Sequence, residues 1–384
     1  MCPGRARARR RTGPAGALVL CACTALAPAT AGADSSVIGP VGGELLASRA
    51  TVVLGQPGTL APPANITASG WLVADLDTGA VLAARDAHGR YAPASTLKTL
   101  TALTLIPRLA PARTVTATRA DVAVDGSKVG LVPGQSYRVD QLFTALLVVS
   151  ANDAANTLST AAGGATGTVA RMNAEAVRLQ ALDTTARTVS GLDAPGQVSS
   201  AYDLALIGRA AMRLRPFRQY VAVRRSFVPA PGGRRIEIGS HNRLLWNYPG
   251  AIGIKNGYTV AAGAAFIGAA TRGGRTLEVT LLHASPRVWH EAAALLDWGF
   301  AAAGRVTPVG QLVDPRVTGG PTAAPLDAGR GRVESRQGAV GSAPARTPAG
   351  PGRAPGLLAV ATLLVGAGGL IRWRCRPSGH ADTT

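Results

Sequence analysis

Cysteine is missing from the whole interior of this 384-residue chain. The four cysteines are Cys2, Cys21, Cys23 and Cys375, so a domain between them can hold neither a disulfide nor a cysteine metal site. The five histidines show no spacing typical of metal ligands. We therefore expect no metal and no cofactor.

Aromatic and acidic residues are also scarce. Aromatic residues make up 4% of the chain, and 21 acidic residues face 40 basic ones, for a formal net charge of +19. A basic surface attracts nucleic acids or anionic polymers of the cell envelope. No lysine or arginine run with interleaved aromatic residues occurs, so we expect no nucleic-acid partner. The 47% of hydrophobic residues suffices for a core, and the length allows one or two domains.

The N-terminus has the three-part pattern of a secretory signal peptide. Arginines without acidic residues come first, an apolar stretch covers 16–27, and small residues follow up to Ala33. We predict a signal peptide over 1–33, cleaved after Ala31 or Ala33. A buried helix fits this order of residues less well.

The C-terminus carries a second apolar stretch. Residues 355–371 are uncharged, and Arg372, Arg374 and Arg376 follow. The stretch is near the short limit for a transmembrane helix, and arginines mark the cytoplasmic side. We predict a transmembrane helix over 355–371 and a cytoplasmic tail over 372–384. The part of the chain between the two ends would then be an extracytoplasmic part of a single-pass protein of the cell membrane.

Between the two ends, composition separates a folded middle from flexible flanks. Residues 34–65 and 305–354 are rich in Gly and Pro, so we expect a flexible N-terminal segment and a linker. The domain should span 66–304. Periodicity predicts both strands and helices along it. The expected strands are 71–76, 80–84, 252–259, 264–271 and 275–282; the expected helices are 96–106, 141–149, 153–161, 171–182, 202–212 and 286–303.

The first candidate for chemistry is the pair Ser95 and Lys98. Pro93 favours a helix start just after it, and a spacing of three places both side chains on one helix face. A serine hydroxyl becomes a nucleophile when a base takes its proton, and a lysine held beside it can be that base. The alternative is a helix cap followed by a solvated lysine.

Two further stretches carry polar groups where a core is expected. Ser150 and Asn152 lie between two apolar helices, and buried hydroxyl and amide groups need partners. Lys255 and Gly257 lie on a predicted strand. The lysine offers a cation, and the glycine allows a substrate or backbone to approach closely. The alternatives are a helix cap and a surface lysine.

The order Ser-x-x-Lys, Ser-x-Asn, Lys-x-Gly resembles the three-motif pattern of penicillin-binding proteins and serine β-lactamases. More of the chain, over about 69–304, is similar to the D-alanyl-D-alanine carboxypeptidases, the low-molecular-weight penicillin-binding proteins. The matching segments are 93–98, 150–155, 172–176, 191–193, 200–204, 255–259 and 262–263.

This resemblance implies an α+β fold of the β-lactamase/DD-peptidase type. It has an antiparallel sheet flanked by helices plus an all-helical subdomain, here with the predicted C-terminal transmembrane helix. The implied substrate is a peptidoglycan stem peptide ending in D-Ala-D-Ala, and β-lactam antibiotics would be inhibitors.

The resemblance also implies roles for single residues. Ser95 would form an acyl-enzyme with Lys98 taking its proton, Ser150 would pass a proton to the leaving amine, and Asn152 would orient Lys98 and the substrate. Lys255 would bind the terminal carboxylate of the substrate.

The strand 255–259 would complete the site. Backbone N–H groups of Ser95 and Tyr258 would hold the oxyanion. The third motif is usually Lys-Thr-Gly, but here it reads Lys255-Asn256-Gly257. The Asn256 amide can still donate a hydrogen bond, and Thr259 is a candidate to share the contact with the carboxylate.

Two other functions remain open from the sequence. A serine β-lactamase would share the nucleophile, but no acidic residue between Ser150 and Lys255 has the Glu-x-x-x-Asn setting expected for its deacylating base. A non-catalytic peptidoglycan-binding envelope protein would not need an intact set of site residues.

Overall fold

The computed structural model describes residues 39–55, 58 and 60–316. The predicted signal peptide 1–33, the predicted span 355–371 and the tail 372–384 lie outside these residues. Within the described part, the structure contains no helix with the length and apolar character needed to cross a membrane.

An antiparallel sheet of seven strands forms the centre of the fold. Its hairpins β3–β4 and β10–β11 form where the sequence predicts them. The order along the sheet is β1 (Thr51–Val52), β4 (Ala80–Arg85), β3 (Gly70–Asp75), β11 (Arg275–Ala284), β10 (Gly263–Arg272) and β9 (Ala251–Thr259), and β13 (Gly310–Gln311) also pairs with β4. Strand β9 therefore forms one edge.

Local turn chemistry sets both hairpins. After β3, Asp75 Oδ1 accepts hydrogen bonds from the backbone nitrogens of Asp77 and Thr78, at 3.0 and 2.9 Å. Between β10 and β11, Gly273 and Gly274 adopt φ values of 56° and 78°. Two residues with positive φ give the turn whose twist matches a two-residue hairpin.

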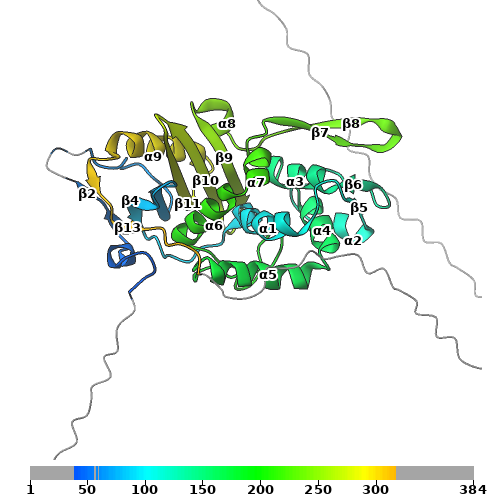
Figure 1. Ribbon diagram of the computed structural model, residues 1–384, viewed down its shortest axis with the longest axis horizontal. Coiled ribbons are helices and arrows are strands. Elements are labelled where there is room, and N and C mark those ends of the chain that lie inside the picture. Colours follow the sequence, from blue (N-terminus) through cyan, green and yellow to red (C-terminus); the bar gives the residue numbers. More distant parts are fainter. Residues whose placement is uncertain (1–38, 56–57, 59, 317–384) are drawn as a thin grey trace, which may run out of the picture. The chain divides into compact units, whose positions relative to one another are not determined.

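Helices cover both faces of the sheet (Figure 1). Helix α9 (Val288–Ala302) packs on one face, where Trp71, Phe266 and Leu295 belong to one buried cluster. Helix α6 (Ala201–Arg213) lies on the other face, and Ser200 caps it by accepting a hydrogen bond from Asp203 N at 3.1 Å. The predicted antiparallel sheet flanked by helices is confirmed.

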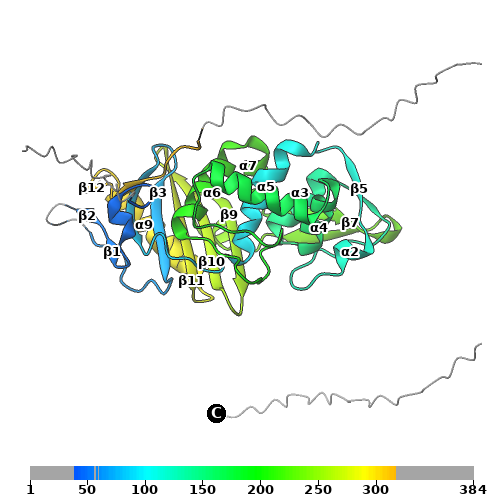
Figure 2. The ribbon, with the colours of Figure 1, turned by 90° about the horizontal axis from the view of Figure 1, so that it is seen from below.

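A helical unit lies beyond β9, on the α6 side (Figures 1 and 2). It contains α1 (Lys98–Leu105), α2 (Arg119–Val122), α3 (Val139–Val148), α4 (Asn152–Ala161), α5 (Ala165–Arg178) and α7 (Arg215–Val221). The expectation of an all-helical subdomain is wrong in one respect. Strand β5 (Thr114–Thr116) pairs with β6 (Ser136–Arg138), and three residues are too few to show a strand period.

A second two-stranded element stands apart from the main sheet. Strands β7 (Arg225–Pro229) and β8 (Arg235–Gly239) form a hairpin that contacts α3. The short helix α8 (Leu244–Asn247) then leads into β9. This hairpin and α8 border the edge of the sheet that carries the third motif.

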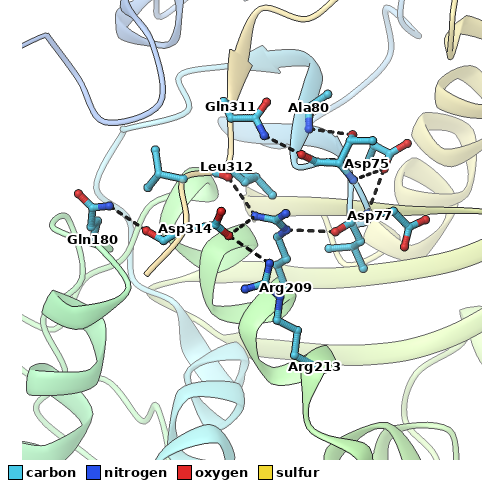
Figure 3. Close-up of polar contacts among 12 residues, drawn as sticks. Asp75, Asp77, Ala80, Gln180, Arg209, Arg213, Gln311, Leu312 and Asp314 are labelled. Atoms are coloured by element: carbon cyan, nitrogen blue, oxygen red, sulfur yellow. Dashed lines mark hydrogen bonds and ion pairs between the residues drawn. The ribbon is translucent and has the colours of Figure 1, made fainter. Parts of the chain in front are cut away.

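The described fold reaches into both flanks that were expected to be flexible. Strand β1 pairs with β4, and β2 (Leu54–Gly55) pairs with β12 (Val306–Thr307). Arg209 of α6 connects the chain after β13 to the chain after β3. Its guanidinium donates hydrogen bonds to the carbonyl of Leu312 and to that of Leu76, both at 3.0 Å (Figure 3). Asp314 adds ion pairs with Arg209 and Arg213. Strands of two residues leave no pattern in a Gly- and Pro-rich sequence, so the sequence does not reveal them.

Candidate active site

Ser95 and Lys98 lie at the start of the first long helix of the domain. A single 3₁₀ turn, Ala94–Leu97, precedes α1, so helical structure begins slightly before the predicted residue 96. Lys98 Nζ lies 2.9 Å from Ser95 Oγ. The structure thus brings the predicted nucleophile and its predicted base into hydrogen-bond contact.

The ammonium group of Lys98 is surrounded by oxygen atoms. Besides Ser95 Oγ, it contacts Asn152 Oδ1 at 2.7 Å and the Ser190 carbonyl at 2.6 Å. Neither of these two oxygens can donate a hydrogen bond. If Lys98 is neutral, its two N–H groups are therefore used by Asn152 and Ser190, and its lone pair is left for the Ser95 hydroxyl.

The surroundings of Lys98 also favour the neutral amine. The side chain is completely buried. Burial, and after it the charge of Lys255, lower the pKa of Lys98 well below its usual value. Loss of hydration disfavours the charged form, and a nearby cation adds to the effect. The geometry and the electrostatics both suit a base.

Asn152 is fixed in one orientation. Its Nδ2 donates to the carbonyl of Asp125 at 2.7 Å, and its backbone nitrogen donates to the carbonyl of Ser127 at 2.7 Å. The amide oxygen must therefore face Lys98. The neighbouring Asp153 carboxylate supports this loop, because it accepts hydrogen bonds from three consecutive backbone nitrogens, those of 129–131.

Ser150 lies at the junction between α3 and α4, two residues before Asn152. It is buried, and its backbone has a φ of 61°, a value rare for residues other than glycine. Within the described part of the chain its Oγ has no hydrogen-bond partner. Buried hydroxyls usually have one, so this hydroxyl keeps its bonding capacity for another molecule.

Strand β9 presents Lys255 and Gly257 to the helical unit and Asn256 to the opposite face, as the alternation of a strand requires. Lys255 is buried, its Nζ contacts the carbonyl of Asn256 at 2.6 Å, and burial lowers its pKa to about 7. A Cβ at Gly257 would lie 2.5 Å from Ser95 N. The close backbone approach predicted at this glycine is therefore present, and it is made by the nucleophile itself.

The last two residues of β9 have different surroundings. Tyr258 is 58% exposed. Thr259 Oγ1 donates to Asp193 Oδ1 at 2.8 Å and accepts from Ala262 N at 3.0 Å. The sequence suggested that the Thr259 hydroxyl contacts the substrate carboxylate. In the structure this hydroxyl donates its hydrogen bond to Asp193 instead.

Asn256 borders a cavity of about 210 Å³ on the outer side of β9, with His241, Arg243 and Trp289 among the residues that line it. Burial, and then the charge of Lys255, lower the pKa of His241. The sequence did not indicate His241 or Arg243. The only hint was their place just before α8, on a loop whose partner strand was unknown.

A large part of the chain matches a known protein family. Residues 57–285 match the family model described as D-alanyl-D-alanine carboxypeptidase. The chain belongs to this family. The predicted family and the predicted enzyme class, a serine-type carboxypeptidase, are thereby confirmed.

Relatives agree with this assignment. The carboxypeptidase DacB2 of Mycobacterium tuberculosis is 46% identical over 253 residues, which cover 64% of this chain and 87% of that protein. DacC of Escherichia coli is 31% identical, covering 64% of each chain.

Solved structures show the same fold. A D-alanyl-D-alanine carboxypeptidase from M. tuberculosis H37Rv has a TM-score of 0.63 at 44% identity, covering 69% of this chain and all of that one, 100%. The Streptomyces K15 DD-transpeptidase has a TM-score of 0.60 at 28% identity, covering 63% of this chain and 100% of its own. The DD-peptidase-like fold predicted from the motifs is confirmed.

Proposed function

We propose that this enzyme removes the terminal D-alanine from peptidoglycan stem peptides through an acyl-enzyme on Ser95. The observation that carries the proposal is the contact of Lys98 Nζ with Ser95 Oγ, in a buried site where two other acceptors account for the remaining N–H groups of a neutral amine. A base poised in this way activates a serine hydroxyl.

In the first step, Ser95 Oγ attacks the carbonyl carbon between the two D-alanines while Lys98 takes the hydroxyl proton. The negative charge then develops on the carbonyl oxygen. In this proposal, the backbone N–H groups of Ser95, in the 3₁₀ turn η2 (Ala94–Leu97), and of Tyr258, in β9, donate hydrogen bonds to it. Preorganised donors of this kind contribute about 3 kcal/mol or more to the transition state.

In the second step, the C–N bond breaks and D-alanine leaves as an amine. The Ser150 hydroxyl, which has no partner of its own among the described residues, passes its proton to this amine and takes up the proton that Lys98 removed from Ser95. Lys255 of β9 interacts with the carboxylate of the leaving residue, and Asn256, which faces the cavity on the other side of the strand, contacts another part of the substrate. Water then attacks the acyl carbon, releases the shortened peptide and restores Ser95.

A β-lactam would acylate Ser95 by the same attack, because its amide bond is placed like the scissile bond. A β-lactamase would additionally need a carboxylate that activates water quickly. Two of the acidic residues between Ser150 and Lys255 are engaged elsewhere: Asp193 accepts a hydrogen bond from Thr259 at 2.8 Å, and Glu175 pairs with Arg178 at 2.7 Å. We therefore propose a slowly deacylated penicillin adduct.

A second candidate function is transfer of the acyl group to an amine. It is favoured by the similarity to the Streptomyces K15 DD-transpeptidase. The same acyl-enzyme serves both reactions, and the acceptor alone distinguishes them.

The proposed location is the outer side of the cell membrane. This proposal rests on the signal-peptide pattern of 1–33 and on the apolar stretch 355–371 with the arginines after it. The Gly- and Pro-rich residues between the domain and this stretch would let the domain reach the wall polymer.

The experiment incubates the purified protein with fluorescent penicillin and with a pentapeptide ending in D-Ala-D-Ala. We expect a stable adduct at Ser95 and release of D-alanine, and neither with Ser95→Ala. Ser136→Ala, at an exposed serine in β6, is the matched control and should keep both activities. Absence of adduct and of D-alanine release in the unaltered protein would refute the proposal. Rapid penicillin turnover would favour a β-lactamase, and an added amine appearing in the product would favour transpeptidation.

A further inference from the structure

A second cavity lies beside the β7–β8 hairpin, outside the proposed catalytic centre. It has a volume of about 550 Å³, and Arg225, His241, Arg243 and Trp246 are among the residues that line it. His241 and Arg243 also line the cavity that Asn256 borders. The two hollows therefore adjoin, and together they run from the third-motif strand to the base of the hairpin.

The charge around this second cavity is strongly positive. The stretch 224–243 contains five arginines and one acidic residue, Glu237. Glu237 pairs with Arg225 at 3.0 Å, where both side chains are solvent-exposed. Arg243 takes part in none of the ion pairs found among the described residues. Exposed ion pairs contribute little and exchange readily, so the cavity offers guanidinium groups to an incoming anion.

Aromatic packing orients these groups. The guanidinium of Arg225 lies 5.5 Å from the ring centre of Trp246. The indole is held in turn, because its Nε1 donates to the Ser240 carbonyl at 3.0 Å, and the side chain remains 40% exposed. A guanidinium stacked on a ring keeps its in-plane N–H donors free for a carboxylate or phosphate. The indole leaves apolar surface for a sugar ring.

We propose that this arginine-lined cavity, defined by Arg225, Arg243 and Trp246, binds an anionic group of the polymeric wall substrate while β9 holds the end of a stem peptide. The inference rests on the proposed function, and names a binding site for the part of the polymer beyond the scissile bond. The ligand group is a carboxylate or a phosphate carried on a glycan-containing chain.

Two observations favour a polymer over a free anion or a flat membrane. The cavity shares His241 and Arg243 with the hollow that Asn256 of β9 borders, so an anion within it can be covalently continuous with a peptide held at β9. It is recessed between the hairpin and α8, a shape that suits a chain. A second contact on one polymer also raises the effective concentration of its peptide ends at Ser95, which gives the cavity a function in catalysis on walls.

The test compares D-alanine release from insoluble cell-wall polymer with release from the soluble pentapeptide, each at low and high salt. The double variant Arg225→Gln/Arg243→Gln should lower the ratio of polymer activity to peptide activity by about tenfold or more, because it loses contacts to charged groups. The same variant should also weaken the dependence of this ratio on salt. The matched control is Arg234→Gln/Arg235→Gln, which removes the same charge from the same hairpin near its turn, and should leave the ratio unchanged.

Other outcomes would show that the cavity does not bind the polymer. An unchanged ratio in the first variant would overturn the inference, and an equal fall in both variants would mean general attraction by a basic hairpin. Loss of sedimentation with anionic phospholipid vesicles, at an unchanged ratio, would identify a membrane contact instead. Repeating the test on walls stripped of phosphate polymers separates the two sources, since a carboxylate ligand predicts that the variant defect persists. If the unaltered protein releases no D-alanine from the soluble peptide, the proposed function itself fails.

Discussion

Gly257 lies directly against the backbone nitrogen of Ser95, so closely that a Cβ at this glycine would be 2.5 Å from that nitrogen and 3.0 Å from Thr96 N. The edge strand of the sheet thus touches the turn that carries the nucleophile. This contact places the backbone N–H of Ser95 beside β9, where the second proposed oxyanion donor, Tyr258, also lies. The position of the oxyanion site depends on the absence of a side chain at 257.

Gly257→Ala should therefore reduce acylation far more than it reduces stability. The added methyl group must push β9 and the η2 turn apart, and a displacement of about 1 Å at a reacting centre can cost about a hundredfold in rate. Stopped-flow acylation by penicillin measures the rate, and thermal unfolding reports stability. Gly167→Ala is the control, since its Cβ would meet Arg171 at an ordinary 3.4 Å. Acylation within a few fold of the unaltered rate in Gly257→Ala would show that the contact yields easily.

The charge of Lys255 sets the pH range in which Lys98 can act. Acylation needs neutral Lys98, so its rate should rise with pH through the pKa of that group. Burial, then the charge of Lys255, lower the pKa of Lys98. Lys255→Met removes the charge, which should raise the pKa of Lys98 and move the rising part of the profile to higher pH. The effect should be greatest below pH 7, because the pKa of Lys255 is itself about 7.

The measurement is the acylation rate constant at saturating penicillin across pH, which separates the shift from weaker binding. Lys128→Met, at an exposed lysine, should leave the profile in place. A uniform fall in rate with no shift of the profile would mean that Lys255 only binds substrate and does not tune Lys98.

The sequence predicted the parts of the site that depend on local spacing. Ser95 and Lys98 meet because three residues make about one helical turn, and Asn152 meets Lys98 because the start of α4 lies where periodicity placed it. The hairpins of the sheet followed from turn residues such as Gly273 and Gly274.

The sequence could not show the contacts of the site that backbone atoms form, or those between segments far apart in the chain. Lys98 is held by the carbonyl of Ser190 and Asn152 by that of Asp125, and a carbonyl leaves no trace in residue identity. His241 reaches the back of β9 only through the fold, with its backbone nitrogen bonded to Val148 O at 3.0 Å. The strands β2 and β12 are two residues each, so only their pairing reveals them.

We expect the Asn256 side chain to act as a hydrogen-bond donor, so that a threonine at this position can take over its function. Its side chain faces the cavity beside His241 and Arg243, on the opposite side of β9 from Lys255. Asn256→Thr keeps a donor, so kcat/KM for the pentapeptide should stay within about tenfold. Asn256→Val has the shape of threonine without the hydroxyl, and its kcat/KM should fall by about tenfold to a hundredfold, the effect of losing one hydrogen bond to a charged group of the substrate. Equal activity of the two variants would show that position 256 does not bind the substrate.

Glu278 is a buried carboxyl group that the proposed mechanism does not use. It lies on β11 against α6, so close to Gly208 that a Cβ there would overlap its Oε1. Neither carboxyl oxygen has a hydrogen-bond partner among the described residues. Burial raises the pKa of Glu278 well above its usual value, although the charge of Arg209 acts in the opposite direction. Burial therefore favours the neutral form of this carboxyl group in the folded protein.

Glu278→Gln should make the protein more resistant to alkaline pH. With its folded-state pKa raised, the glutamate favours folding fully below the unfolded value of 4.5 and loses this contribution as pH rises toward the folded-state pKa. The amide cannot ionise, so the variant should gain up to about 1.4 kcal/mol in unfolding free energy over the unaltered protein for each pH unit within that interval. Urea unfolding at acidic, neutral and alkaline pH measures the difference. The control is Glu44→Gln, at an exposed site, whose plot of unfolding free energy against pH should run parallel to that of the unaltered protein. A parallel plot for Glu278→Gln would mean that the buried carboxyl ionises in the folded protein as readily as in water.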